Sequence, residues 1–396
     1  MMTKFGSNFT VVMRNRSRKG WPGGDMVAMD GFAKALVAVG VNVKNNVSKT
    51  GQVVVISWNI NYPWVLDHLV QAKAAGHHFL VFAFNMNIND KGYQRLVAEY
   101  ADGIIFISRA EKDSFETYIG LKVKVPVFYC GIGVNETYIS QKLTGKKGVI
   151  NIGRIERRKN QLNLIQACKK LDLPLTLVGT VSDQEYYQEC RLVEGKWSKC
   201  RWLKNLSELK LKREYEQAKV IAHPAVFEPW GLTVREGALA NCNLVMTQAT
   251  YAKATFPQVW WVNPKSQPDL VKKLEAAYEQ PNSIKNQQFT LTNYSYTKLG
   301  QQLKHILEQV AGTSPQAVDA TFWRTAAELG VNRALEQEER LLDQDKLIQA
   351  LDQANRKKQA AIEFLQKSNR EKQQALEAKF PDREMYFLKK IWRKIK

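Results

Sequence analysis

The sequence predicts an α/β protein that is built from two successive doubly wound parallel sheets, followed by a helical extension. Short apolar runs alternate with segments of helical spacing through the first 310 residues, a pattern typical of repeated strand–helix–strand units. A glycine-rich, polar stretch at residues 131–148 interrupts this alternation once. We therefore expect three domains: residues 1–140 and 141–310, each with its own sheet, and a helical arm at residues 311–396.

The first domain is expected to contain buried strands that are joined by helices. Continuous apolar runs predict strands at residues 9–13, 53–56, 79–84, 104–107 and 125–129. Helical spacing between these runs predicts helices at residues 25–39, 63–75, 92–100 and 110–119. Because helices separate the strands, the strands are expected to run parallel.

The second domain repeats this plan after the interruption. The expected strands lie at residues 149–152, 175–178, 201–203, 220–222 and 243–246 and near Trp260, and the expected helices lie at residues 160–170, 183–193, 207–218 and 232–240. Two such sheets in succession imply a central cleft between two Rossmann-like domains. Ligands of doubly wound sheets bind at the carboxyl ends of the strands, so we expect the functional site at that cleft.

The helical arm is expected to contain a helix over residues 317–329 that Gly330 ends, and a longer helix from Asn332 to about Lys379. A weak heptad repeat in the longer helix leaves two interpretations open: a solvated arm, or a coiled coil that forms a homo-oligomer. The repeat consists of Leu341, Ile348, Asn355, Ile362, Asn369 and Leu376. Residues 385–396 form a basic amphipathic segment that is suited either to peripheral membrane contact or to closing the core.

The composition is that of an ordinary soluble globular protein, with 44% hydrophobic and 24% charged residues. The sequence contains no apolar run of membrane-spanning length, no signal-peptide pattern and no CxxC pair among its five cysteines. We therefore expect a cytoplasmic protein, with peripheral attachment to the inner face of the membrane as an option. The net charge of +20 favours polyanionic partners, and residues 141–310 carry 26 Lys/Arg against 15 Asp/Glu.

Residues 223–243 carry the most informative motif. Glu228 lies in a Pro- and Gly-containing loop, and Glu236 lies in the helix that follows. The helix begins near Gly231, Leu232 and Thr233, where free backbone N–H groups are available. This segment, with Phe227, resembles the Glu-x7-Glu segment of the family 4 retaining glycosyltransferases of the GT-B fold. The resemblance implies that Glu228 contacts the hydroxyls of a donor sugar and that Glu236 holds the ribose.

A second segment supports the same resemblance. Gly153, Arg154 and Lys159 follow the first strand of the second domain and resemble the family's strand, Gly-Arg and downstream Lys. By that resemblance Arg154 and Lys159 clamp the diphosphate of a nucleotide sugar. Fixed cations suit this role because the leaving nucleoside diphosphate accumulates negative charge.

A third, weaker segment follows the first predicted strand. Gly23 and Gly24 resemble the family's glycine pair, which brings backbone N–H groups close to the donor phosphate or the acceptor. Several cations precede them and would give the cleft a positively charged lip. These cations are Arg14, Arg16, Arg18 and Lys19.

The resemblance implies a hexosyltransferase that retains anomeric configuration, binds no cofactor tightly and uses a nucleotide sugar, for which a UDP-sugar is favoured. It also implies a reaction that needs no metal. The favoured acceptor is an anionic or membrane-associated glycan in surface glycan, lipopolysaccharide or capsule synthesis. The alternative enzyme is a phage-type DNA glucosyltransferase that acts on hydroxymethylated bases, where the positive charge would neutralise nucleic-acid phosphates. An alternative of another class is a catalytically silent nucleic-acid-binding or scaffold protein.

Overall fold

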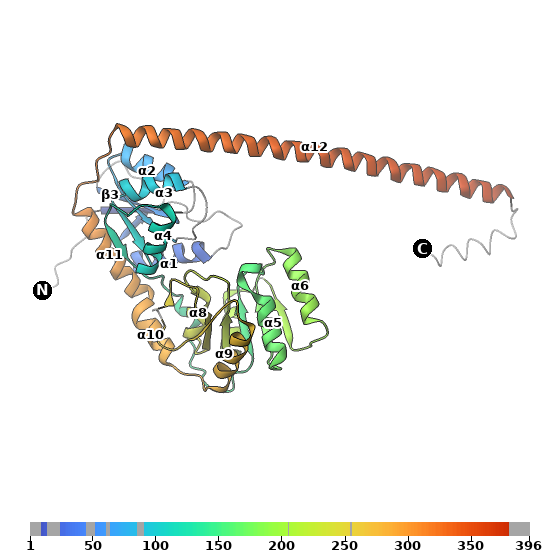
Figure 1. The fold of residues 1–396 in the computed structure, drawn as a ribbon, viewed down its shortest axis with the longest axis horizontal. Coiled ribbons are helices and arrows are strands. Elements are labelled where there is room, and N and C mark those ends of the chain that lie inside the picture. Colours follow the sequence, from blue (N-terminus) through green and yellow to red (C-terminus); the bar gives the residue numbers. More distant parts are fainter. Residues whose placement is uncertain are drawn as a thin grey trace. The chain divides into compact units, whose positions relative to one another are not determined.

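The computed structural model describes residues 9–13, 24–44, 52–60, 64–84, 91–204, 206–253 and 256–379. The chain forms two compact units, residues 1–326 and residues 327–396. Within the first unit the described residues form two six-stranded sheets in which neighbouring strands are parallel (Figure 1). The predicted α/β fold with two successive doubly wound sheets is confirmed.

The first sheet has the strand order β2-β1-β3-β4-β5-β6. Its elements in chain order are β1 (Phe9–Met13), α1 (Gly24–Ala38), β2 (Asn42–Lys44), β3 (Gln52–Trp58), α2 (Trp64–Ala74), β4 (His78–Phe82), α3 (Lys91–Tyr100), β5 (Gly103–Phe106), α4 (Arg109–Ile119) and β6 (Val127–Tyr129). The central strands β4 and β5 are buried along their whole length, which explains their continuous apolar runs. Strand β2 was not predicted from the sequence, because this short strand at the sheet edge is mostly exposed and has no apolar run.

The second sheet has the order β12-β11-β10-β7-β8-β9. Its elements are η1 (Glu136–Tyr138), β7 (Val149–Ile152), η2 (Arg157–Lys159), α5 (Gln161–Lys170), β8 (Leu175–Val178), α6 (Gln184–Glu194), β9 (Cys200–Leu203), α7 (Glu208–Gln217), β10 (Val220–His223), α8 (Leu232–Leu239), β11 (Asn243–Thr247), β12 (Trp260–Val262) and α9 (Gln267–Glu279). Helices α5 and α9 pack against each other on the apolar cluster that contains Leu164 and Leu274.

The strand order places a topological switch point between β7 and β10. From β7 the chain proceeds to β8 and β9 on one side, and it then returns to β10 on the other side of β7. In sheets of this class, the loops at the carboxyl ends of the strands beside such a switch point form the ligand-binding crevice. Gly153 follows β7 at this switch point, and His223 is the last residue of β10.

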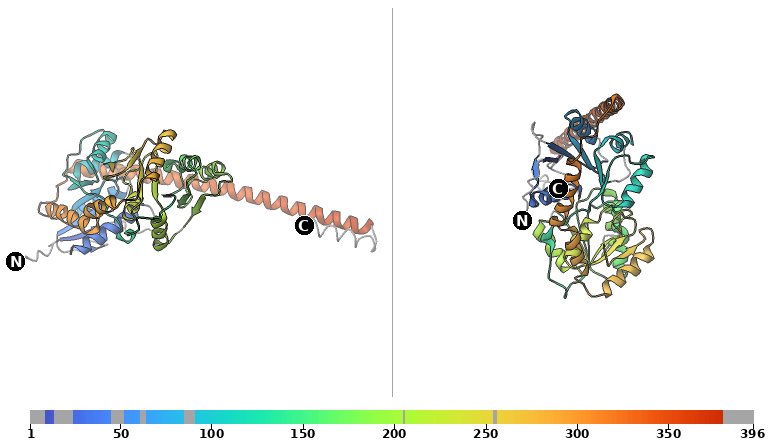
Figure 2. Two further views of the ribbon diagram at one scale, coloured as in Figure 1. Left: turned by 90° about the horizontal axis from the view of Figure 1, so that it is seen from below. Right: turned by 90° about the vertical axis from the view of Figure 1, so that its left-hand side faces the viewer.

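Two helices carry the chain away from the second sheet and back to the first domain. These are α10 (Lys285–Tyr294) and α11 (Tyr296–Ala311). Helix α11 packs along α1 (Figure 2). Its residues Leu299, Leu303 and Leu307 join the core of the first domain. The sequence-based boundary at residue 310 grouped these residues with the second sheet, because spacing alone shows that a helix is amphipathic but not which core it joins.

Helix α12 (Ala320–Lys379) is continuous through Gly330, where the sequence predicted a break. A glycine inside a helix costs only about 1 kcal/mol relative to alanine, so the flanking residues can carry the helix through it. The boundary between the two units falls inside this helix, and the described residues 327–379 all belong to it. None of the described helices has a stretch that is long and apolar enough to cross a bilayer.

Some of the sequence-based predictions concern residues outside the described ranges or residues of the helical arm. Gly23, the cations at residues 14–19 and the basic segment 385–396 lie outside the described residues. In the heptad repeat, the side chains of Ile348 and Ile362 are 55% and 38% exposed.

The packing of α11 on α1 depends on Gly300. A Cβ atom at this position would lie 2.2 Å from the carbonyl oxygen of Ala35. We expect Gly300→Ala to lower the free energy of unfolding by about 1–3 kcal/mol, because backbone would have to move to admit the methyl group. Urea unfolding followed by circular dichroism measures this. The control is Gln301→Ala at the exposed neighbouring position, and equal stability of the two variants would contradict the packing.

Candidate active site

The residues singled out in the second domain follow strands of the same sheet. Gly153 and Arg154 come directly after β7, and Lys159 ends the short helix η2. Glu228 lies in the loop between β10 and α8, and Glu236 lies in α8 itself. Because β7 and β10 are parallel neighbours, both loops leave the sheet at its carboxyl edge.

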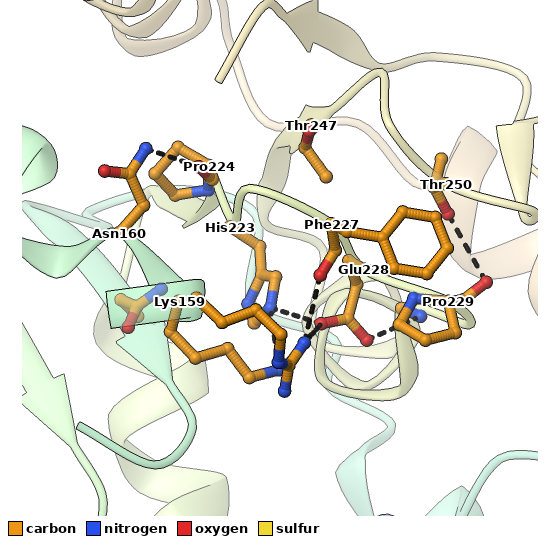
Figure 3. Close-up of polar contacts among 12 residues, drawn as sticks. Lys159, Asn160, His223, Pro224, Phe227, Glu228, Pro229, Thr247 and Thr250 are labelled. Carbon is orange, nitrogen blue, oxygen red and sulfur yellow. Dashed lines mark hydrogen bonds and ion pairs between the residues drawn. The ribbon is translucent and has the colours of Figure 1, made fainter. Parts of the chain in front are cut away.

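Lys159 and Glu228 form a direct ion pair at this edge. Lys159 Nζ lies 2.7 Å from Glu228 Oε2, and the two side chains are only 12% and 10% exposed. The side chain of His223 completes the cluster, with its Nε2 atom 2.8 Å from the same carboxylate oxygen (Figure 3). The fold thus brings together Lys159 and Glu228, which are 69 positions apart in the sequence.

The electrostatics of this cluster keep Glu228 ionised. Burial alone would raise the pKa of Glu228, but the Lys159 ammonium and His223 outweigh burial and hold it well below its usual range. Burial lowers the pKa of His223, and the neighbouring positive charge of Lys159 lowers it further. The cluster therefore contains a carboxylate, an ammonium group and a neutral imidazole.

The backbone at the start of α8 also contacts Glu228. The Gly231 N–H donates to Glu228 Oε1 at 3.3 Å, and Gly231 adopts φ 64°, a left-handed conformation that glycine accepts without strain. Leu232 and Thr233 then begin α8, so the first turn of this helix lies next to the Glu228 loop. N–H groups of a first helical turn have no partner within the helix and are available to an anion.

Gly153 and Gly179 bring the ends of β7 and β8 close together. A Cβ atom at Gly179 would lie 1.9 Å from the carbonyl oxygen of Gly153, so no larger residue fits there. A Cβ atom at Gly153 would lie 3.5 Å from Cε of Lys159. The glycine backbone therefore lies directly beside the Lys159 side chain.

Arg154 is placed differently from Lys159. Its side chain is 55% exposed, and its Nε atom lies 3.4 Å from Glu156 Oε2. Arg158 is nearer to the ion pair: it donates to the carbonyl oxygen of Phe227 at 2.9 Å and lies 3.8 Å from Glu228 Oε2. Arg158 was not among the predicted site residues, because a basic run in the sequence does not reveal which of its side chains turn towards the site.

Glu236 contacts a tyrosine on another helix. The hydroxyl group of Tyr215, on α7, lies 2.6 Å from Glu236 Oε2 and 3.2 Å from the carbonyl oxygen of Thr233. Burial raises the pKa of Glu236 to about 7. The hydroxyl group has one proton for two acceptors, and a protonated Glu236 would supply the second hydrogen bond. The hydrogen bonds of Glu236 thus join it to α7, whereas those of Glu228 join it to the β7 loop.

The loop that carries Glu228 also reaches the first domain. Trp230 is buried in the apolar core of that domain, with its ring centroid 4.6 Å from that of Phe84. Phe227 packs against Tyr251, whose hydroxyl group hydrogen-bonds to that of Ser114 on α4. Phe227 was among the predicted site residues but Trp230 was not, because in the sequence Trp230 cannot be distinguished from any other core residue.

His223 and Gly179 are two further residues that the sequence analysis missed. His223 ends β10, which borders the switch point, and Gly179 directly follows β8, the next strand beyond β7; this position at the carboxyl ends of predicted strands was the available signal. A histidine at the end of an apolar run is more often a buried structural residue, so its role becomes visible only through its contact with Glu228.

The raised pKa of Glu236 generates a prediction about stability. Its carboxyl group binds a proton more tightly in the folded protein than in the unfolded chain. The resulting stabilisation is therefore full below about pH 4.5 and is lost as the pH rises towards about 7. We expect Glu236→Gln, which stays neutral, to be more stable than the wild type at pH 8 by roughly 1–3 kcal/mol and nearly equal at pH 4.5. Urea unfolding at several pH values tests this, and parallel pH curves would refute it.

Comparisons with known proteins agree with this architecture. Residues 136–295 match the family described as "Glycosyl transferases group 1". No curated protein matches the sequence significantly. The structure of sucrose-phosphate synthase from Thermosynechococcus elongatus is similar, with a TM-score of 0.60 and 13% identity over 77% of this chain and 100% of that chain.

Two further structures show the same similarity. A trehalose-6-phosphate structure from E. coli bound with UDP-2-fluoro glucose has a TM-score of 0.56 and 12% identity, covering 74% of this chain and 79% of that chain. A trehalose-6-phosphate synthase, studied with bisubstrate glycomimetics for glycosyl transfer with retention, has a TM-score of 0.56 and 13% identity over 73% and 80%. These similarities identify the fold as GT-B with two Rossmann-like domains, and the match of residues 136–295 supports a glycosyltransferase of group 1.

Proposed function

We propose that this protein is a retaining glycosyltransferase of family 4 that transfers a hexose from a UDP-sugar to an acceptor hydroxyl group. The observation that carries the proposal is the buried Lys159–Glu228 pair at the crevice between β7 and β10. A cation and a carboxylate at that place are suited to a ligand that is negatively charged at one end and rich in hydroxyl groups at the other.

In this proposal the donor diphosphate binds beside Gly153 and Gly179. The close approach of these two glycines leaves backbone rather than side chains next to Lys159, which provides the positive charge. Arg154 is half exposed and can turn from Glu156 towards the same phosphates. Glu228 accepts hydrogen bonds from the sugar hydroxyls, and Glu236 accepts them from the ribose once it is ionised.

The proposed chemistry is a displacement on one face of the sugar. The bond between the anomeric carbon and the diphosphate oxygen breaks, and the acceptor oxygen bonds to the anomeric carbon from the same side. The acceptor proton passes to the departing phosphate oxygen. Lys159 stabilises the charge that develops on the leaving diphosphate without needing to reorganise, and binding in the crevice aligns the two reactants.

The proposed acceptor is a negatively charged or membrane-associated glycan. Residues 141–310 carry an excess of 11 positive charges, which attracts anionic ligands. The similar structures include proteins named as sucrose-phosphate and trehalose-6-phosphate synthases, whose names indicate phosphorylated sugars. Peripheral attachment to the inner face of the membrane through residues 385–396 stays part of this proposal.

Substitution of the two charges tests the proposed site. We expect Lys159→Ala and Glu228→Gln each to lower turnover of the nucleotide sugar by at least about 100-fold, because each removes a contact to the reacting molecule. Lys159→Ala should also weaken UDP binding, whereas Glu228→Gln should leave UDP binding nearly unchanged. Nucleotide release and calorimetric titration with UDP measure the two effects.

The matched control is Lys272→Ala, which removes an exposed cation of α9 in the same domain. It should retain wild-type turnover and UDP affinity. Before kinetics, a thermal-shift screen over UDP-, GDP-, ADP- and TDP-sugars identifies the donor, because a ligand that binds the folded state raises its stability. Wild-type turnover in Lys159→Ala or Glu228→Gln would refute the site.

The proposed reaction also predicts independence from divalent metal ions. Lys159 and Arg154 can supply the positive charge that a metal ion provides in other sites. We expect turnover to stay within about two-fold of its untreated value after dialysis against EDTA. Loss of activity on chelation, restored by Mg²⁺ or Mn²⁺, would show that a metal ion shares this role.

A further inference from the structure

His223 is a buried polar residue in contact with the proposed sugar-binding carboxylate. It is the last residue of β10, and its side chain is 1% exposed. Its Nε2 atom lies 2.8 Å from Glu228 Oε2 and 3.3 Å from Lys159 Nζ (Figure 3). Its other ring nitrogen, Nδ1, is buried and has no hydrogen-bond partner among the described residues.

Chemistry fixes which nitrogen of His223 carries the proton. Ionised Glu228 can only accept hydrogen bonds, and the Lys159 ammonium can only donate them. The Nε2 atom faces both groups and is closer to the carboxylate. Nε2 therefore carries the proton, and the Nε2–H group donates a hydrogen bond to Glu228. The 3.3 Å approach of Lys159 Nζ is then a contact between two donors that share one acceptor rather than a hydrogen bond.

Glu228 needs this second donor when a diphosphate is bound. In the structure its Oε2 atom is held by Lys159 and His223, and its Oε1 atom accepts from Gly231. A donor diphosphate beside Gly153 would compete with Glu228 for the three N–H donors of the Lys159 ammonium group and so weaken the contact between Lys159 and Glu228. A buried carboxylate that loses its partner is strongly destabilised, and it either gains a proton or moves.

The two donors differ in rigidity. Lys159 reaches Glu228 through a flexible side chain with four rotatable bonds, whereas His223 is a planar ring on a buried strand. Phosphate binding can therefore redirect Lys159, but it leaves the imidazole where it is.

We infer that His223 is a positioning residue that holds the Glu228 carboxylate in place for the sugar while Lys159 turns to the diphosphate. The inference rests on the proposed function and adds a residue to it. His223 touches Glu228 rather than the substrate, so its effect on transfer is exerted through Glu228.

Two amide substitutions separate this role from simple packing. The side-chain nitrogen of Gln reaches approximately the position of His Nε2, whereas that of Asn reaches only as far as His Nδ1. We expect His223→Gln to keep kcat for nucleotide-sugar hydrolysis within about five-fold of the wild type. We expect His223→Asn to lower kcat by about 10- to 100-fold, the loss that a small misplacement of a reacting group produces.

The readouts are kcat and KM for the nucleotide sugar that the wild type hydrolyses fastest among UDP-, GDP-, ADP- and TDP-glucose, and calorimetric affinity for the matching nucleoside diphosphate. Affinity for the diphosphate should change by less than about three-fold in both variants, because Lys159 is retained. In a Glu228→Gln background, His223→Asn should add less than about three-fold, since the two residues act through one contact. If Asn prevents folding, His223→Met, which has no donor, replaces it with the same expectation.

The outcomes distinguish this inference from the proposed function. An active wild type with unchanged kcat in His223→Asn overturns the inference alone. Equal losses in the Gln and Asn variants, with lower melting temperatures for both, assign His223 to packing and also overturn it. A wild type that neither binds nor hydrolyses any of the four nucleotide sugars removes the proposed function and this inference with it.

Discussion

The architecture of the site depends on the ion pair between Lys159 and Glu228. Both side chains are almost fully buried, and neither charge could be accommodated there alone at low cost. The pair joins the loop after β7 to the loop after β10, whose other links include the bond from the Val226 N–H to the carbonyl oxygen of Arg158. Such a pair contributes little net stability, because desolvation offsets its attraction, but it fixes the relative position of the two loops.

The sequence was informative wherever the backbone topology alone decides the outcome. Apolar runs separated by helical spacing predict parallel sheets. In a doubly wound sheet the chain first adds strands on one side of its first strand and then returns to add strands on the other side, as β10 does beside β7. This brings the loops of Lys159 and Glu228 together although the two residues are 69 positions apart in the sequence. Strands such as β4 and β10 could be predicted because their continuous burial requires an apolar run in the sequence. The mostly exposed edge strand β2 has no such run.

The sequence was not informative wherever a side chain chooses between partners on different elements. The sequence assigned Glu228 and Glu236 to different parts of one ligand but did not reveal their protein partners. The hydrogen bonds of Glu228 involve Lys159 and His223, whereas the close partner of Glu236 is Tyr215 on α7. Helix α11 likewise presents an apolar face that either core could have covered, and the small residue Gly300 selects α1. These side-chain partners and helix contacts are visible only in the folded structure, because they depend on distances between elements that the periodicity of the sequence does not encode.

Trp230 links the ion pair to the first domain and so constrains how the two domains can cooperate. It lies two residues after Glu228, yet its ring is buried beside Phe84 in the core of the first domain. A second contact lies near the connections between the domains, where the Val134 N–H donates to the carbonyl oxygen of Tyr294 at the end of α10. Because Trp230 and Glu228 lie on the same loop, a rotation of one domain against the other would have to withdraw Trp230 from this core or deform the loop that carries Glu228.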